Sequence, residues 1–106
     1  MARSLIKVSP NPRRGEVIEI KTLISHEMET GFRHTSTGAA IPRDIITSFV
    51  ATYNGEEIFA AQLFPAIAAN PFITFYTIAR ESGVLEFRWT GDNGYAASEQ
   101  VKITVE

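Results

Sequence analysis

The sequence contains no cysteine among its 106 residues. The fold therefore depends on no disulfide bond, and the chain cannot supply a thiol nucleophile. Because reduced and oxidising compartments both tolerate a cysteine-free protein, this absence does not locate the protein. Histidine is also scarce: His26 and His34 are the only two.

Long apolar runs and basic stripes are absent as well. No apolar run approaches the roughly 18 residues that a membrane-spanning helix needs, so we expect no membrane partner. Residues 1–10 hold no apolar core of signal-peptide length, which by itself predicts a cytoplasmic protein. The formal net charge is -2 and both signs are mixed along the chain, which argues against nucleic acid as the main partner.

What is present is an ordinary globular composition. Hydrophobic residues make up 44% of the chain and charged residues 21%, so disorder is not expected. A chain of this length forms one domain, residues 1–106, and buries about two thirds of its unfolded surface.

Hydrophobic alternation with a period of two predicts strands that each bury one face. In the segment from Glu16 to His26, isoleucines and Thr22 share one face and charged residues the other. The segment from Phe72 to Ala79 is apolar on both faces, which predicts a central strand or a covered one. The expected strands are residues 4–8, 16–26, 45–53, 56–63, 72–79, 83–90 and a last strand around 101–105.

Turn signals separate these strands. Asn54-Gly55 is a common two-residue hairpin turn, because both positions tolerate a positive φ, and Asp92-Asn93-Gly94 closes another hairpin. Pro65 and Pro71 bracket a segment with room for one helical turn at most. We therefore predict an all-β fold, an immunoglobulin-like antiparallel β-sandwich of about seven strands, with Trp89 in its core.

The residues offer little catalytic chemistry. One hypothesis is a small metal-dependent enzyme that uses His26, His34 and either Glu27 or Glu29 as ligands. It ranks third among the functions we consider, because a zinc site usually needs three or four protein ligands. Paired catalysis by Glu56 and Glu57 is not expected, because successive strand positions point to opposite faces. We expect no catalytic residue, no cofactor and no metal ligand.

Two connecting segments carry apolar side chains where loops normally carry polar ones. Residues 24–33 and 64–72 place large apolar groups between strands, and such groups tend to be covered by a partner. Arg33 and Arg43 flank the intervening polar stretch and could pair with a carboxylate or an oxyanion.

The same segments carry a family resemblance. Ser25-His26-Glu27-Met28-Glu29-Thr30-Gly31-Phe32-Arg33 and Pro65-Ala66-Ile67-Ala68-Ala69-Asn70-Pro71 resemble the Z subunit of the bacterial Sox sulfur-oxidation carrier, SoxZ. The likeness continues through Phe49 to Gly55 and Glu81 to Phe87, in order along nearly the whole chain. Two positions depart from the family pattern, which often has proline at Glu27 and histidine at Phe64.

The resemblance implies a non-catalytic subunit that pairs with a SoxY-type subunit as a heterodimer. In that family the partner carries a C-terminal cysteine to which sulfur intermediates stay covalently attached, and other Sox enzymes make transient contacts. The family also implies the periplasm, reached by co-export with a signal-bearing partner. We therefore expect a periplasmic location and not the cytoplasmic one. We also expect that the isolated chain could form a homodimer.

No catalytic residues come with the resemblance, so the site prediction concerns the partner interface. The expected interface residues are Met28, Glu29, Phe32, Arg33, Arg43, Phe64, Ile67, Asn70 and Phe72. The alternative is a free-standing immunoglobulin-like module that binds protein or carbohydrate through the same loops.

Overall fold

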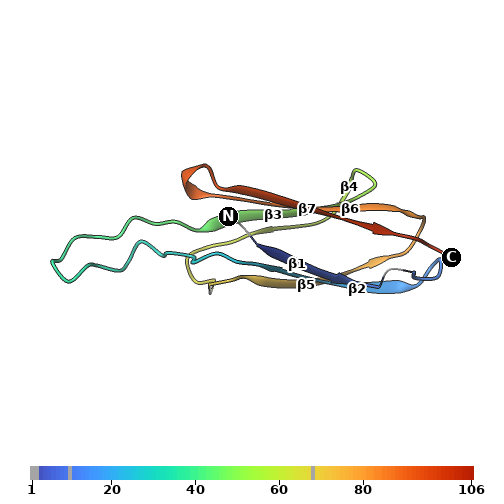
Figure 1. The fold of residues 1–106 in the computed structure, drawn as a ribbon, viewed down its shortest axis with the longest axis horizontal. Helices are drawn as coiled ribbons and strands as arrows, with labels where there is room; N and C mark the ends of the chain where they lie inside the picture. Colours follow the sequence, from blue (N-terminus) through green and yellow to red (C-terminus); the bar gives the residue numbers. More distant parts are fainter. Residues whose placement is uncertain (1–2, 10, 68) are drawn as a thin grey trace.

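The computed structural model describes residues 3–9, 11–67 and 69–106. Within these residues, seven strands form two antiparallel sheets, which confirms the predicted all-β sandwich (Figure 1). The strands are β1 (Ser4–Val8), β2 (Val17–Ile24), β3 (Ile46–Tyr53), β4 (Glu56–Gln62), β5 (Phe72–Ile78), β6 (Gly83–Gly91) and β7 (Ala96–Ile103).

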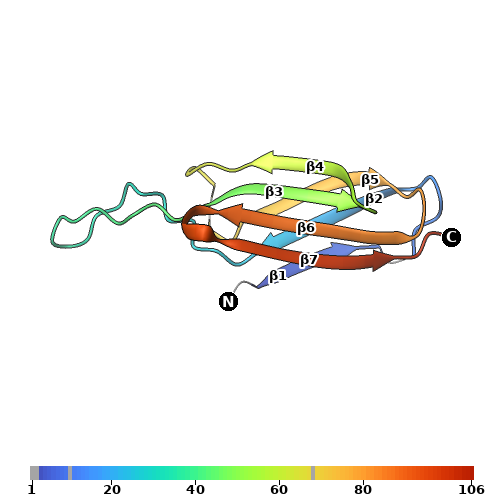
Figure 2. The same cartoon turned by 90° about the horizontal axis from the view of Figure 1, so that it is seen from above.

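One sheet has the strand order β1-β2-β5 and the other the order β4-β3-β6-β7. Figure 2 shows the four-stranded sheet lying over the three-stranded one with the strand directions roughly aligned, as in other sandwiches. Among the described residues, no helix is of a length and hydrophobicity that could span a lipid bilayer.

The core lies between the sheets and is built from the alternating residues of each strand. Ile18, Ile20 and Ile24 of β2 are buried, and Leu85, Phe87 and Trp89 of β6 face them from the other sheet. The period-two alternation of residues 16–26 and 83–90 predicts these inward positions, and their burial confirms them.

An aromatic cluster joins the two sheets. The ring of Phe49 on β3 lies 5.3 Å from that of Trp89 and 6.2 Å from that of Phe75, between centroids. Phe75 on β5 stacks on Phe59 of β4 at 4.6 Å. Aromatic pairs at these separations add about 0.5–1.5 kcal/mol each beyond the area they bury, so the cluster fixes how the sheets face each other.

The two turns with clear sequence signals form as positive-φ turns. Asn54 and Gly55 have φ values of 50° and 84°, the conformation that the β3–β4 hairpin needs. Asp92–Gly94 forms a single turn of 3-10 helix, η1, between β6 and β7. The segment after β4 contains turns, and no helix is assigned to its described residues. The run Pro10-Asn11-Pro12 predicts the end of the first strand, because proline cannot donate a regular ladder hydrogen bond. Pro10 and Ala68 lie outside the described residues.

Strand β5 differs from its expected place. Its apolar character on both faces predicted a central or covered strand, but it is an edge strand beside β2. Phe75 faces the core, whereas Phe72, Tyr76 and Ile78 point outward and are 51–61% exposed. The sequence pattern correctly indicated that both faces of β5 are apolar, but the described residues of the chain cover only one of them.

The connection from β2 to β3 leaves the sandwich as a long narrow arm, residues 25–45 (Figure 1). The radius of gyration is 16.3 Å, compared with about 13 Å for a compact chain of this length. The arm accounts for this extended shape.

Candidate interaction surface at the arm end

The arm is a two-stranded ribbon held mainly by its own backbone. Glu29 and Asp44 exchange two backbone hydrogen bonds of 2.8 Å near the sandwich. Farther out, Ile41 donates to the carbonyl of Arg33 at 2.9 Å, and Thr35 donates to Ala39 at 2.8 Å. Residues 32–40 are all exposed, so this outer part has no core of its own.

Glycine is required where the two sides of the arm approach closely. Gly31 has a φ of 88°, and a Cβ at this position would lie 3.0 Å from the Cβ of Arg43. Both the left-handed backbone and the close approach favour glycine.

Two ion pairs hold the charged residues of the arm. Arg33 donates to both carboxylate oxygens of Glu29, with the shortest contact, Nη2 to Oε1, at 2.5 Å. This hydrogen bond lowers the pKa of Glu29 below its ordinary value. Arg43 donates through Nε and Nη2 to Asp92 of η1, each at 2.9 Å. Both arginines are thus paired with carboxylates of the chain itself, and their predicted place at a partner interface stays a prediction.

Asp92 fastens the root of the arm to the end of the sandwich. Its Oδ2 also accepts a hydrogen bond from the backbone N–H of Ile45 at 3.1 Å. The bond from Arg43, together with this backbone bond, lowers the pKa of Asp92 below its ordinary value. Sequence reasoning treated Asp92 only as a turn residue, because its partners lie 47 and 49 positions away.

His26 joins the arm to the β4–β5 loop. Asn70 accepts a hydrogen bond from the His26 N–H through Oδ1 at 3.0 Å and donates its own N–H to the His26 carbonyl at 2.7 Å. The ring of His26 packs edge-on against Tyr95, with centroids 4.7 Å apart. These contacts give His26 a structural role at the end of β2. The side chain of Asn70, a predicted interface residue, binds the backbone of His26 within the same chain.

Met28 lies in the core, which corrects its predicted place on the interaction surface. Its side chain is 4% exposed, and its sulfur accepts a hydrogen bond from the N–H of Ile46 at 3.3 Å. Its φ of 53° turns the chain so that the side chain points inward. The N–H of Met28 is bound by Nδ1 of His26 at 3.0 Å. An acidic substitution at Met28 would therefore test the core and not an interface.

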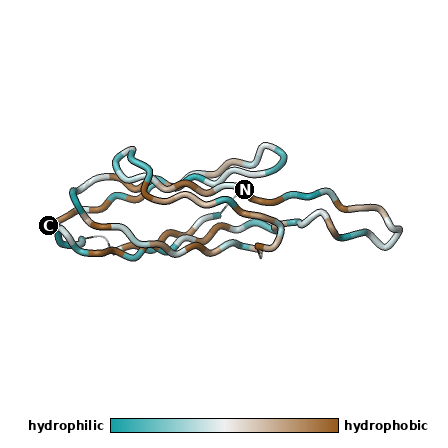
Figure 3. The backbone as a smooth tube through the Cα atoms, turned by 180° about the vertical axis from the view of Figure 1, so that it is seen from behind, coloured by the Kyte–Doolittle hydropathy of each residue, from teal (hydrophilic) through white to brown (hydrophobic). Residues whose placement is uncertain are grey.

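The other predicted apolar residues remain on the surface at the arm end. We call Phe32, Phe64, Ile67 and Phe72 the arm-end patch; they are 78%, 62%, 38% and 61% exposed. Phe64 and Ile67 lie in the β4–β5 loop and Phe72 begins β5, whereas Phe32 lies on the arm. Figure 3 shows apolar positions continuing from the sandwich onto the arm.

A metal centre is not built by these residues. Within residues 3–9, 11–67 and 69–106, no three histidine, aspartate or glutamate side chains are placed to hold one ion together. His34 pairs through its backbone with Ala40 on the outer arm, away from His26. The arrangement at the arm end is suited to binding a protein surface, with exposed apolar groups beside paired charges.

Comparison with known protein families gives a match over most of the chain. The family model described as "Sulphur oxidation protein SoxZ" matches residues 6–102. No curated protein sequence matches the chain.

Several solved structures share the fold at low sequence identity. The sulfur carrier protein SoxY from Chlorobium limicola f thiosulfatophilum has a TM-score of 0.70 at 9% identity, covering 97% of this chain and 78% of that one. A superoxide reductase (neelaredoxin) from Ignicoccus hospitalis has a TM-score of 0.72 at 15% identity, covering 97% and 80%. A putative superoxide reductase from Thermotoga maritima has a TM-score of 0.71 at 14% identity, covering 97% and 85%. At these identities the likeness shows the fold alone.

Proposed function

Because this chain belongs to the SoxZ family of sulfur-oxidation proteins, we propose that it is the non-catalytic half of a heterodimeric sulfur carrier. Its companion is a SoxY-type subunit whose C-terminal cysteine holds the sulfur intermediate of thiosulfate oxidation. The family match over residues 6–102 is the observation that carries this proposal.

The absence of cysteine suits this division of labour. A thiolate beside a sulfur-loaded cysteine attacks it and releases the adduct by exchange. This chain has no cysteine, so it covers the partner without discharging the cargo. The covalent chemistry then belongs to the companion subunit and to the enzymes that visit it.

The arm-end patch is the contact surface in this proposal. Phe32 and Phe64 expose most of their area, and rigid aromatic side chains are frequent anchors of protein interfaces. Arg33 lies beside Phe32 at the rim, and its side chain is 68% exposed although it is paired with Glu29. In this position it supplies positive charge near an anionic sulfur adduct.

The test is native mass spectrometry of the chain co-expressed with a SoxY-type subunit. Wild type is expected to give a one-to-one complex, and thiosulfate with the Sox enzymes adds sulfur-containing mass to the companion subunit only. Phe32→Ser and Phe64→Ser are expected to weaken the complex at least tenfold each. Val17→Ser is the control, because Val17 is as exposed as Phe64 but lies at the start of β2, away from the arm.

Two different failures can be told apart. If both phenylalanine variants bind like wild type, the arm-end surface is wrong while the carrier function stands. If the wild-type chain binds no cysteine-bearing companion and stays a lone monomer, the carrier proposal fails in favour of a free-standing binding module.

A further inference from the structure

The outward faces of the two sheets have opposite character. On the four-stranded sheet the outward residues of β6 and β7 are mainly polar, among them Glu86, Arg88, Ser98, Gln100 and Lys102. On the three-stranded sheet, Leu5, Val17, Phe72, Tyr76 and Ile78 are each more than half exposed. An exposed sheet face in a soluble monomer is normally polar, so the apolar face is a candidate for contact with another molecule.

The residues of this face form four rows across the strands. From the arm end outward along β2, the rows are centred on Leu23, Lys21, Glu19 and Val17. The strand register places Leu5 and Phe72 beside Leu23, Lys7 and Thr74 beside Lys21, Tyr76 beside Glu19, and Ile78 beside Val17. The face therefore reads apolar, basic, acidic, apolar.

This order is complementary to itself. Consider two copies packed face to face and related by a two-fold axis in the plane between them. The axis runs perpendicular to the strands at the level of Ile20. It then places the first row of one copy opposite the fourth row of the other. It also exchanges the second row with the third. Leu23 then faces Val17 of a second copy, and Lys21 faces Glu19 of a second copy. Each pair occurs twice, as symmetry requires for an isologous contact.

We propose that the outer face of the β1-β2-β5 sheet is a homodimer interface in which a second copy of this chain packs face to face. We commit to a second copy as the occupant because, in this orientation, Lys21 and Glu19 of one copy each meet the opposite charge of the other. Glu19 and Lys21 are 3.5 Å apart within one chain, and each side chain is nearly half exposed, so both charges remain available to a second copy.

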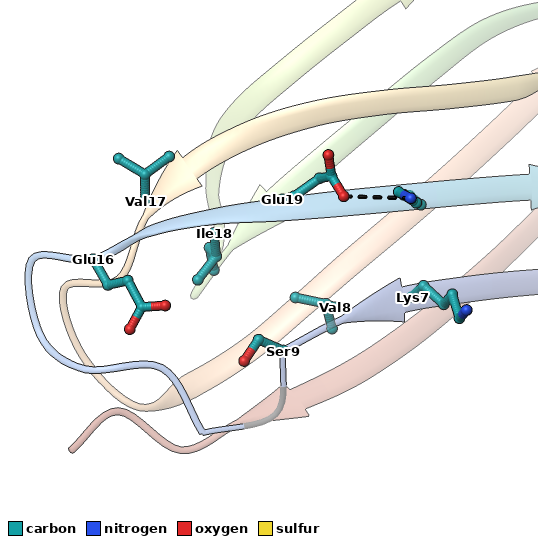
Figure 4. Close-up of a pocket in the computed structure, with 8 residues that line it drawn as sticks. Lys7, Val8, Ser9, Glu16, Val17, Ile18 and Glu19 are labelled. Carbon is teal, nitrogen blue, oxygen red and sulfur yellow. Dashed lines mark ion pairs between the residues drawn. The ribbon is translucent and has the colours of Figure 1, made fainter.

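The shape of the face fits the same orientation. Strand β1 ends at Val8, opposite Ile20, whereas β2 begins earlier, at Val17. This difference leaves an open groove of about 350 Å³ beside the first residues of β2. Figure 4 shows Val17 and Glu19 on one side of β2, with the groove between this strand and the end of β1. The two-fold axis places Leu23 of one copy over Val17 of the other. The same axis places Leu5 of the first copy over the groove of the second.

The size of the face predicts a reversible dimer. Three strands with a central strand of eight residues span roughly 27 Å by 14 Å, which is several hundred Å² for each copy. Stable interfaces bury about 800 Å² for each partner, so we expect the association to be weak and reversible. Phe72 belongs to both this face and the arm-end patch; the other residues of the dimer face lie outside that patch.

The test is a charge-reversal mixing experiment followed by sedimentation equilibrium. Wild type is expected to approach twice its mass of 11.7 kDa as concentration rises. Glu19→Lys and Lys21→Glu each place like charges opposite one another, so each alone is expected to dimerise at least tenfold more weakly. An equimolar mixture of the two variants pairs opposite charges again and is expected to regain the wild-type affinity. Only an interchain contact gives this result, because the intrachain pair stays broken in both variants.

Glu86→Lys is the matched control, since it makes the same charge change on the outward face of the other sheet and is expected to leave the dimer unchanged. Ile78→Ser is a second variant, expected to weaken the dimer without altering charge. The proposal is overturned if wild type stays monomeric into the millimolar range or if the mixture associates no better than either variant alone. A monomeric wild type whose heterodimer is weakened by Glu19→Lys would assign the face to the companion subunit instead.

This proposal does not rest on the proposed function. Phe64→Ser is expected to weaken the heterodimer and keep the homodimer, and Val17→Ser is expected to do the reverse. Failure of one proposal therefore leaves the other standing.

Discussion

Asp92 accepts three hydrogen bonds at the root of the arm, two from Arg43 and one from the Ile45 N–H. Met28, whose sulfur accepts a hydrogen bond from the Ile46 N–H in the same root region, turns its side chain into the core through a left-handed backbone. At the scale of single residues, the arm is thus positioned by polar contacts to η1 and by one inward-turned methionine. Neither role is visible in the local sequence pattern.

The pKa of Asp92 leads to a prediction about acid stability. Because Arg43 holds this pKa below the ordinary value of 3.8, the ionised form contributes stability that is fully present above about pH 4. That contribution is lost as the pH falls through the lowered value. Asp92→Asn should melt at a lower temperature than wild type at pH 7, and the difference should shrink as the pH falls below 4.

Thermal melts followed by circular dichroism from pH 7 to pH 2 would check this. Glu99→Gln is a suitable control, because Glu99 lies on the exposed part of β7 and its carboxylate accepts a hydrogen bond from the hydroxyl of Ser4. A difference between Asp92→Asn and wild type that persists unchanged at pH 2 would contradict the assignment.

At the scale of elements, Tyr53 fastens the end of β3 to the connection between β5 and β6. Its ring is buried, and its hydroxyl accepts hydrogen bonds from the N–H groups of Arg80 at 3.2 Å and Glu81 at 3.1 Å. It also donates to the carbonyl of Glu81. One side chain thereby satisfies three backbone groups of a connection that crosses between the sheets.

We predict that Tyr53→Phe destabilises the sandwich by about 1–3 kcal/mol, because it leaves these backbone groups without their partner. For a domain of this size that is a fall in melting temperature of about 4–8 °C for each kcal/mol. Tyr76→Phe removes a hydroxyl that donates to Glu19 on the exposed face and should change the melting temperature little. Equal effects of the two substitutions, measured on dilute protein, would show that Tyr53 does not have this role.

At the scale of the whole molecule, two surfaces of different character lie on one sandwich. The arm-end patch consists of exposed apolar residues around a protruding ribbon, whereas the outer face of the three-stranded sheet carries the apolar and charged rows of the proposed homodimer contact. Separate surfaces allow a heterodimer and a homodimer contact to exist in the same assembly, with only Phe72 common to both.

The family membership leads us to propose a periplasmic location, reached in complex with a signal-bearing companion. Cell fractionation with an antibody against this chain would check it. We expect the chain in the periplasm of cells that express the companion with its signal, and in the cytoplasm when that signal is deleted. Export that continues without the companion's signal would refute co-export.

The sequence by itself determined the strands, their inward faces and the hairpin turn at Asn54-Gly55. Each of these depends on local alternation or on the φ preference of single residues. It also indicated the exposed aromatics of the arm end, since Phe32 and Phe64 lie in segments without strand alternation.

Only the tertiary structure decided what depends on pairing between distant segments. It placed β5 at an edge with one apolar face uncovered, buried Met28, and paired Arg43 with Asp92 across 49 positions. Alternation within a strand predicts which residues share a face. It does not predict which other strand or sheet covers that face. The order of strands in the two sheets settles that, and with it which apolar residues remain for another molecule.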